Sequence, residues 1–164
     1  MTENSIEKTS ASAEITGLEL SPRKAACLKY LLSRDEAVRT TEIAENFDVE
    51  PSTITKLIGE LAEEDYVDHI PYRGVRLTAK GKVYAEFCQK RHQILSLVFS
   101  HYGLNPNAAC EEVSRIENNV SKTAIDTICA SMGHPTTSFC TTPGEDKQIK
   151  HRSCLDECKL HAHH

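Results

Sequence analysis

Apolar residues recur at the i, i+3, i+4 spacing of amphipathic helices between residues 22 and 61. The pattern predicts a helix over residues 22–33, a second over 41–47 with Thr40 as its N-cap, and a third that opens with Pro51. Residues 48–50 form the turn between the last two. Two short helices joined by such a turn are typical of a helix-turn-helix, and an ordinary solvated helix in an all-α protein is the alternative.

A predicted hairpin follows directly and favours the helix-turn-helix. Residues 66–70 and 75–77 are short strand-like runs, and the turn-forming sequence PYRG separates them at residues 71–74. A hairpin in this place is a wing. Its tip carries Arg73 and its returning strand carries Arg76, which suit the minor groove or the flanking phosphates.

The residues expected to face DNA are short hydroxyl side chains and cations. Small side chains at the start of the third helix permit a close approach to the major groove, where they contact phosphates or base edges. The predicted DNA-contacting residues are Thr41, Pro51, Ser52, Thr53, Thr55, Lys56, Arg73 and Arg76.

Three more helices are predicted after the wing. The first is long, begins after Thr78 as N-cap and ends near Tyr102. The other two begin after Asn105 and Ser121. Three helices are too few to bury a hydrophobic core of their own well. We therefore expect a homodimer that forms through about residues 105–132. Such a dimer is expected to bind a palindromic operator in double-stranded DNA. The residues expected to point inward are Ala109, Val113, Ile116, Val120, Ile125, Ile128, Cys129 and Met132.

The predicted fold is mainly α, with an N-terminal winged helix-turn-helix, a helical dimerisation domain and a Cys/His-rich C-terminal tail. We expect a flexible leader over residues 1–17, the winged-helix DNA-binding domain over 18–91, the dimerisation domain over 92–133 and the tail over 134–164. No apolar run approaches the ~18 residues of a membrane-spanning helix, and the leader lacks the apolar stretch of a signal peptide. We therefore expect a cytoplasmic protein without a membrane partner.

The net charge of −5 by itself disfavours nucleic acid as a partner. Residues 71–91, however, hold six lysines and arginines against one acid, Glu86. A local basic stripe of this kind is enough to dock a protein on a phosphate backbone. The charge distribution is therefore compatible with DNA binding.

Seven cysteines are many for a chain without an export signal, and they favour metal, cluster or redox chemistry over disulfides. For Cys27, Cys88 and Cys129 the alternative is that they are small buried apolar residues. The tail offers soft ligands for a transition metal ion (iron, manganese or zinc) or an iron–sulfur cluster, unless its metal-binding residues are adventitious. The predicted tail ligands are Cys140, Cys154 and Cys158, with Cys110 or a histidine as the fourth.

Three motifs carry a resemblance to a known family: TEIA at residues 41–44, VEPSTITK at 49–56 and YRGVRLTAKG at 72–81. Over about residues 18–135 the chain resembles the iron- and manganese-dependent repressors related to the diphtheria toxin repressor and the manganese transport regulator. The resemblance implies a winged-helix domain, a helical dimerisation domain and repression of metal-homeostasis genes at palindromic operators.

The resemblance also implies a set of metal ligands, from which this chain departs. His92 and Glu117 stand at matching positions, and Cys110 is a possible soft substitute for a histidine. Two protein ligands do not hold a divalent ion tightly against water, so we predict that this site is lost. Arg23 is predicted to pair with Glu117 instead, and control is expected to have moved to the tail. The positions that lack the family's ligands are Arg23, Ala26, Ser96, Ser114 and Asn118.

The predicted function is a transcriptional regulator, a repressor of metal-homeostasis or redox-related genes, controlled by a metal ion, an iron–sulfur cluster or thiol oxidation. The alternative is an effector-independent winged-helix module that binds DNA or another partner without sensing metal. An enzyme is not expected, because the sequence contains no phosphate-binding loop, no HExxH and no recognisable catalytic triad.

Overall fold

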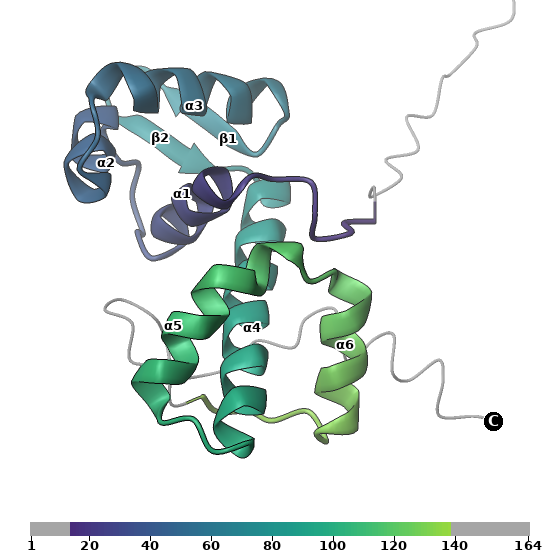
Figure 1. The fold of residues 1–164 in the computed structure, drawn as a ribbon. Helices are drawn as coiled ribbons and strands as arrows, with labels where there is room; N and C mark the ends of the chain where they lie inside the picture. Colours follow the sequence, from purple (N-terminus) through teal and green to yellow (C-terminus); the bar gives the residue numbers. More distant parts are fainter. Residues whose placement is uncertain (1–13, 139–164) are drawn as a thin grey trace, which may run out of the picture.

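The computed structural model describes residues 14–138, and this part is mainly helical, as predicted. Figure 1 shows two halves that share one long helix, with the sheet and the first three helices above and the last two helices below. In chain order the elements are α1 (Pro22–Leu32), α2 (Thr40–Phe47), α3 (Pro51–Glu63), β1 (Val67–Ile70), β2 (Gly74–Leu77), α4 (Ala79–His101), α5 (Pro106–Ile116), the 3-10 turn η1 (Glu117–Asn119) and α6 (Lys122–Ser131).

The predicted helix-turn-helix is formed by α2 and α3. Pro51 occupies the first turn of α3, as predicted, and Asp48 closes α2 in the left-handed conformation with φ +51°. The predicted cap of α2 is wrong by one residue: Arg39 is the N-cap, and Thr40 is already helical. Arg39 makes no side-chain capping bond, so hydroxyl chemistry does not decide where α2 begins. The apolar stripe that buries α3 consists of Ile54, Leu57, Ile58 and Leu61.

The predicted wing is an antiparallel pair in which Val67 lies opposite Leu77 and Ile70 opposite Gly74. Val38 bridges to the returning strand, so the wing also holds the segment between α1 and α2. Gly74 has φ +118°, and a Cβ atom here would lie 2.2 Å from the Val38 carbonyl oxygen. A glycine is therefore required where the wing approaches this segment.

The long helix α4 connects the two halves. Thr78 caps it, accepting a hydrogen bond from the Gly81 amide at 3.0 Å, as the sequence predicted. The helix packs on α1 in the upper half and on α5 and α6 in the lower half (Figure 1). It runs without a break through residue 91, where the sequence analysis placed a domain boundary.

The end of the predicted leader belongs to the packed structure, which corrects the expectation for residues 15–17. Ile15 packs against the core, and the Gly17 carbonyl accepts a hydrogen bond from Arg91 Nη1 at 2.7 Å. The Thr16 carbonyl accepts from the Lys122 amide at 2.7 Å. A segment before α1 is thus fastened to α4 and to the start of α6.

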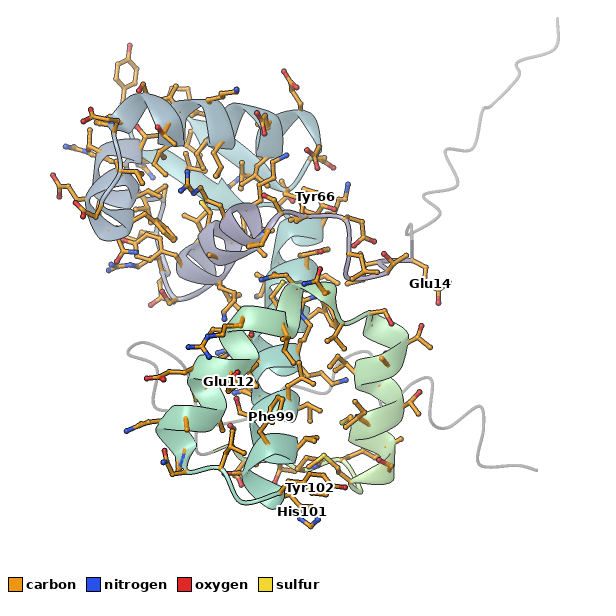
Figure 2. All side chains as sticks on the ribbon, viewed as in Figure 1. Glu14, Tyr66, Phe99, His101, Tyr102 and Glu112 are labelled. Carbon is orange, nitrogen blue, oxygen red and sulfur yellow. The ribbon has the colours of Figure 1, made fainter. Side chains whose placement is uncertain are left out.

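The lower half buries part of the predicted inward set. Ala109, Val113, Ile125 and Cys129 are buried as expected. Ile116 and Met132 were wrongly placed inside, because α5 ends at Ile116 and α6 before Met132, and both side chains are exposed. Tyr102 and His101 lie at the end of α4 farthest from the sheet (Figure 2), and the Tyr102 side chain is exposed.

None of the helices within residues 14–138 is both long enough and apolar enough to span a membrane.

Candidate DNA-binding surface and metal site

The N-terminal half of α3 presents short polar side chains to solvent. Pro51, Ser52, Thr55 and Lys56 are exposed, and Thr53 is half-buried. The Thr55 hydroxyl donates to the Pro51 carbonyl at 2.9 Å, which is a bond within the helix. The apolar stripe holds the opposite side of α3 in the core, so these residues face outward together. Thr41 is likewise exposed in the first turn of α2.

The wing adds two cations and an aromatic residue. Arg73 and Arg76 are exposed, and neither forms an ion pair with any residue in the described range 14–138. Tyr72, next to Arg73, is fully exposed with φ +62°. Sequence reasoning treated Tyr72 only as a turn residue. The sequence feature that singles out Tyr72 is an aromatic side chain within an otherwise polar turn.

The basic stripe predicted over residues 71–91 is only partly a surface, which corrects the sequence analysis. Lys90 and Arg91 are buried, at 3% and 1% exposure. Lys90 Nζ pairs with Asp126 Oδ1 at 2.8 Å, and Arg91 donates to backbone carbonyls. Two of the six cations therefore hold the helical half together, because a buried charge requires partners.

Two acidic side chains at the C-terminal end of α3 form ion pairs with a lysine of α1. Lys24 of α1 pairs with Glu60 at 3.2 Å and with Glu64 at 2.6 Å. Hydrogen bonds to these two acids raise the pKa of Lys24 although burial opposes them, and the strongest contribution comes from Glu64. The Lys80 ammonium donates to the Glu64 carbonyl at 2.7 Å. Because Glu60 and Glu64 stand at the C-terminal end of α3, their charges lie away from its N-terminal half.

The two predicted remnants of a metal site do meet. His92 Nδ1 lies 2.6 Å from Glu117 Oε2, and both side chains are largely buried. The second oxygen, Glu117 Oε1, lies 3.8 Å from Lys29 Nζ of α1. The predicted partner Arg23 is exposed on α1 and does not pair with Glu117, so the prediction chose the wrong cation.

The two halves of the chain match two family models. The N-terminal DNA-binding domain of the iron-dependent repressors matches residues 21–75, and their metal-binding and dimerisation domain matches residues 78–145. The HTH-type transcriptional regulator MntR of Geobacillus thermodenitrificans is 34% identical over 100 residues, which cover 60% of this chain and 71% of that protein. The chain belongs to the iron-dependent repressor family.

Further proteins are similar in sequence or in fold. MntR of Oceanobacillus iheyensis is 38% identical over 90 residues, 55% of this chain, and the match spans 61% of that regulator's length. A hypothetical protein of Sulfolobus solfataricus shares the fold at a TM-score of 0.67 and 22% identity, covering 80% of this chain and 99% of its own. A manganese-dependent transcriptional repressor in complex with manganese is similar at a TM-score of 0.60 and 28% identity. The match covers 70% of this chain and 55% of the repressor chain.

Membership in the iron-dependent repressor family confirms the predicted family, fold class and broad function, a DNA-binding transcriptional regulator. The family model divides the chain between residues 75 and 78, just before α4. The second part corresponds to the family's metal-binding and dimerisation domain.

The interhelical donors of this family member do not fit a divalent ion. No three His, Cys, Asp or Glu side chains within residues 14–138 lie close enough together to hold a metal. Cys110 Sγ lies 3.9 Å from Ser96 Oγ, and the Ser114 hydroxyl donates to the Cys110 carbonyl at 2.8 Å. A structural or regulatory divalent site takes at least three protein ligands, and one imidazole with one carboxylate falls short.

Positively charged side chains of the chain itself lower the pKa of Glu117. Burial alone would raise the pKa of this carboxyl group. The hydrogen bond from His92 and the positive charges of Lys29, His92 and Arg91 outweigh burial, and the pKa is lowered. Glu117 is therefore ionised and paired at neutral pH without an added ion.

Three cysteines of the described part are core residues. Cys27, Cys88 and Cys129 are buried, at 1%, 1% and 0% exposure. Burial raises the pKa of Cys27 to about 12 and that of Cys88 to about 11, so both remain neutral thiols. The apolar alternative is the correct interpretation for these residues. Cys140, Cys154 and Cys158 lie outside the described residues, so the tail site stays a prediction.

Proposed function

We propose that this chain is a transcriptional repressor that places α3 in the major groove of double-stranded DNA and the β1–β2 wing on the neighbouring backbone or minor groove. The observation that carries the proposal is a set of exposed cations, Lys56, Arg73 and Arg76, on the winged helix-turn-helix of a chain whose net charge is −5. None of the three forms an ion pair within the described part of the chain. Such cations are available to displace counterions from phosphates.

The contact residues follow from their placement. Ser52 and Thr53 lie in the first turn of α3, where short side chains allow close approach to base edges and helix amides face phosphates. Lys56 follows one turn later as a phosphate contact. The predicted set of Thr41, Pro51, Ser52, Thr53, Thr55, Lys56, Arg73 and Arg76 is proposed in full, and Tyr72 joins it as an aromatic contact at the wing.

The test is binding of the purified protein to promoter fragments from its own genome, measured by fluorescence anisotropy over a range of salt concentrations. We expect specific retention of fragments that contain a palindrome, with a salt slope that corresponds to several neutralised phosphates. Equal affinity for every fragment at all salt concentrations contradicts the proposal. The regulated genes are proposed to serve metal homeostasis or redox defence, in keeping with the manganese regulators among the relatives.

We propose that the repressor acts as a homodimer through the helical half, about residues 105–132. The exposed side chains of Ile116, Met132 and Tyr102 support this, since large apolar residues at the ends of helices are commonly covered by a second copy. Sedimentation velocity at micromolar protein is expected to give a dimer, and footprinting is expected to protect two half-sites. A monomer that protects one half-site contradicts this assembly.

We also propose that a metal ion or cluster bound by the C-terminal tail controls DNA binding. Cys140, Cys154 and Cys158, with Cys110 or a histidine, are proposed to bind iron, manganese, zinc or an iron–sulfur cluster. We expect anaerobically purified protein to carry metal, with absorbance at ~300–450 nm if a cluster is present. A variant with serine at all three tail positions is expected to lose metal and the DNA response to it. Full metal content in that variant contradicts the tail site.

An effector-independent repressor is the second candidate. The observation that favours it is the donor set of the interhelical site, where Glu117 is paired with Lys29 and His92. Operator titrations with and without chelator separate the two candidates, because an effector-independent repressor binds its operator equally well under both conditions.

A further inference from the structure

Five side chains gather where α1, α4 and the turn η1 meet. Lys29 comes from α1, Arg91 and His92 from α4, and Glu117 and Asn118 from η1. His92 Nδ1 and Lys29 Nζ approach the two Glu117 oxygens at 2.6 and 3.8 Å, and Arg91 Nη2 donates to Asn118 Oδ1 at 3.1 Å. These five residues are called the interhelical clamp below.

The clamp extends to the segment before α1 through Arg91. Its Nη1 atom donates to the Gly17 carbonyl at 2.7 Å and to the Val120 carbonyl at 3.2 Å. The guanidinium group also lies over the Phe87 ring, 5.0 Å from the centroid. The segment that leads into α1 and the turn that leaves η1 are therefore held by one side chain of α4.

The charges of the clamp are shielded from water. The side-chain exposures of Lys29, His92 and Glu117 are 21%, 4% and 12%. Partly buried ion pairs resist screening by salt, and removal of one partner leaves the other charge without compensation. The ammonium group of Lys29 neutralises Glu117 permanently, whereas a bound ion does so only when its supply allows.

Glu117 and Asn118 of η1 bind side chains of two different helices, α1 and α4. Glu117 joins α1 through Lys29 and α4 through His92, whereas Asn118 joins α4 through Arg91. The DNA-binding half is thus linked through α1 to the helical half by bonds that need no added ligand. A divalent ion placed against Glu117 would meet the positive charges of Lys29 and Arg91 and would have to displace the first of them.

We propose that the interhelical clamp replaces a metal ion as the link between the DNA-binding half and the helical half, so that this link holds the DNA-binding arrangement without any divalent cation. The inference rests on the proposed function for its DNA readout. It assigns positioning roles to Lys29, Arg91 and Asn118, and it places any metal response of the protein outside this site.

The first experiment uses the full chain with serine at Cys140, Cys154 and Cys158 and with alanine at His151, His161, His163 and His164, so that the tail contributes neither a thiolate nor an imidazole ligand. Equilibrium dialysis with Mn²⁺ is expected to show no bound ion at protein concentrations in the micromolar range. Operator affinity by anisotropy is expected to agree within about twofold between excess EDTA and excess Mn²⁺. Stoichiometric Mn²⁺ binding, or a Mn²⁺-dependent gain of about tenfold or more in affinity, overturns the proposal.

The second experiment breaks the clamp at α1. Lys29→Met keeps most of the side-chain volume but removes the ammonium, and it is expected to weaken operator binding about tenfold by loosening the arrangement of the two halves. The matched control is Lys24→Met on the same helix, whose acids Glu60 and Glu64 lie within the DNA-binding half. We expect this control to change affinity by no more than about twofold. Equal affinity of Lys29→Met and wild type overturns the positioning role.

A double-mutant cycle of Lys29→Met and Glu117→Gln on the free energy of unfolding provides a readout without DNA. We expect clear coupling: the double variant will be destabilised by less than the sum of the two single destabilisations, because the shared ion pair is lost only once. Additive effects overturn the clamp. If no promoter fragment binds to wild type, the proposed function fails, but the metal dialysis and this cycle still decide the clamp.

Discussion

Replacing Thr53, Lys56 and Arg73 together by alanine will weaken operator binding about 100-fold or more at fixed salt, because each contact contributes about 1–3 kcal/mol. Lys56 and Arg73 are exposed cations of the recognition helix and the wing. The loss of these two phosphate contacts will also reduce the salt slope by about two, since each contact contributes about one. The measurement is a series of anisotropy titrations from low to moderate salt.

The control removes the same two positive charges elsewhere in the DNA-binding half. Lys24→Ala with Arg34→Ala leaves the net charge equal to that of the triple variant, but both residues already pair with acids, Lys24 with Glu60 and Glu64 and Arg34 with Glu42. We expect less than about a fivefold loss of affinity from this general change in charge. If control and triple variant weaken binding equally, the docking surface is not α3 and the wing.

Local signals in the sequence were enough to predict the DNA-binding half. Pro51 opens α3, and the stripe of apolar residues that follows determines which side of the helix is buried. The turn sequence between the strands fixed the wing, and Thr78 fixed the start of α4. Each of these features depends on residues within about one or two helical turns, where propensity and capping rules apply.

The errors about charged residues arose where a side chain has its partner far along the chain. Lys90 and Arg91 belong to a basic run in the sequence, yet their partners are Asp126 and the Gly17 carbonyl. No local sequence pattern predicts a hydrogen bond between residues 17 and 91. Burial of a lysine or arginine depends on tertiary pairing, so composition overestimated the basic surface.

The candidate metal site shows the same limit. The sequence placed His92 beside Glu117 correctly, since both positions carry the family resemblance, but it chose Arg23 of α1 as the cation. Arg23 and Lys29 are six residues apart on α1, which at about 100° per residue puts them on different sides of the helix. Only the rotation of α1 against α4 decides that Lys29 reaches Glu117, and this rotation depends on core packing.

Substituting Gly81 by alanine will destabilise the folded protein by about 3 kcal/mol or more, although it adds a single methyl group. A Cβ atom at this position would lie 1.9 Å from the Tyr66 carbonyl oxygen. That carbonyl accepts a hydrogen bond from the Thr78 amide at 3.1 Å, and Tyr66 is buried at 3% exposure. Neither side can move without displacing the first turn of α4.

The matched control is Gly59→Ala, in which the same methyl group is added to an exposed helical position. No heavy atom outside its own helix lies within 4 Å of the Cβ position at Gly59. The better helix propensity of alanine is therefore expected to stabilise this variant by about 0.5–1 kcal/mol. Urea unfolding followed by circular dichroism measures both variants. A cost below about 1 kcal/mol at Gly81 would show that α4 does not pack against the Tyr66 carbonyl as described, since helix propensity by itself favours the substitution there as well.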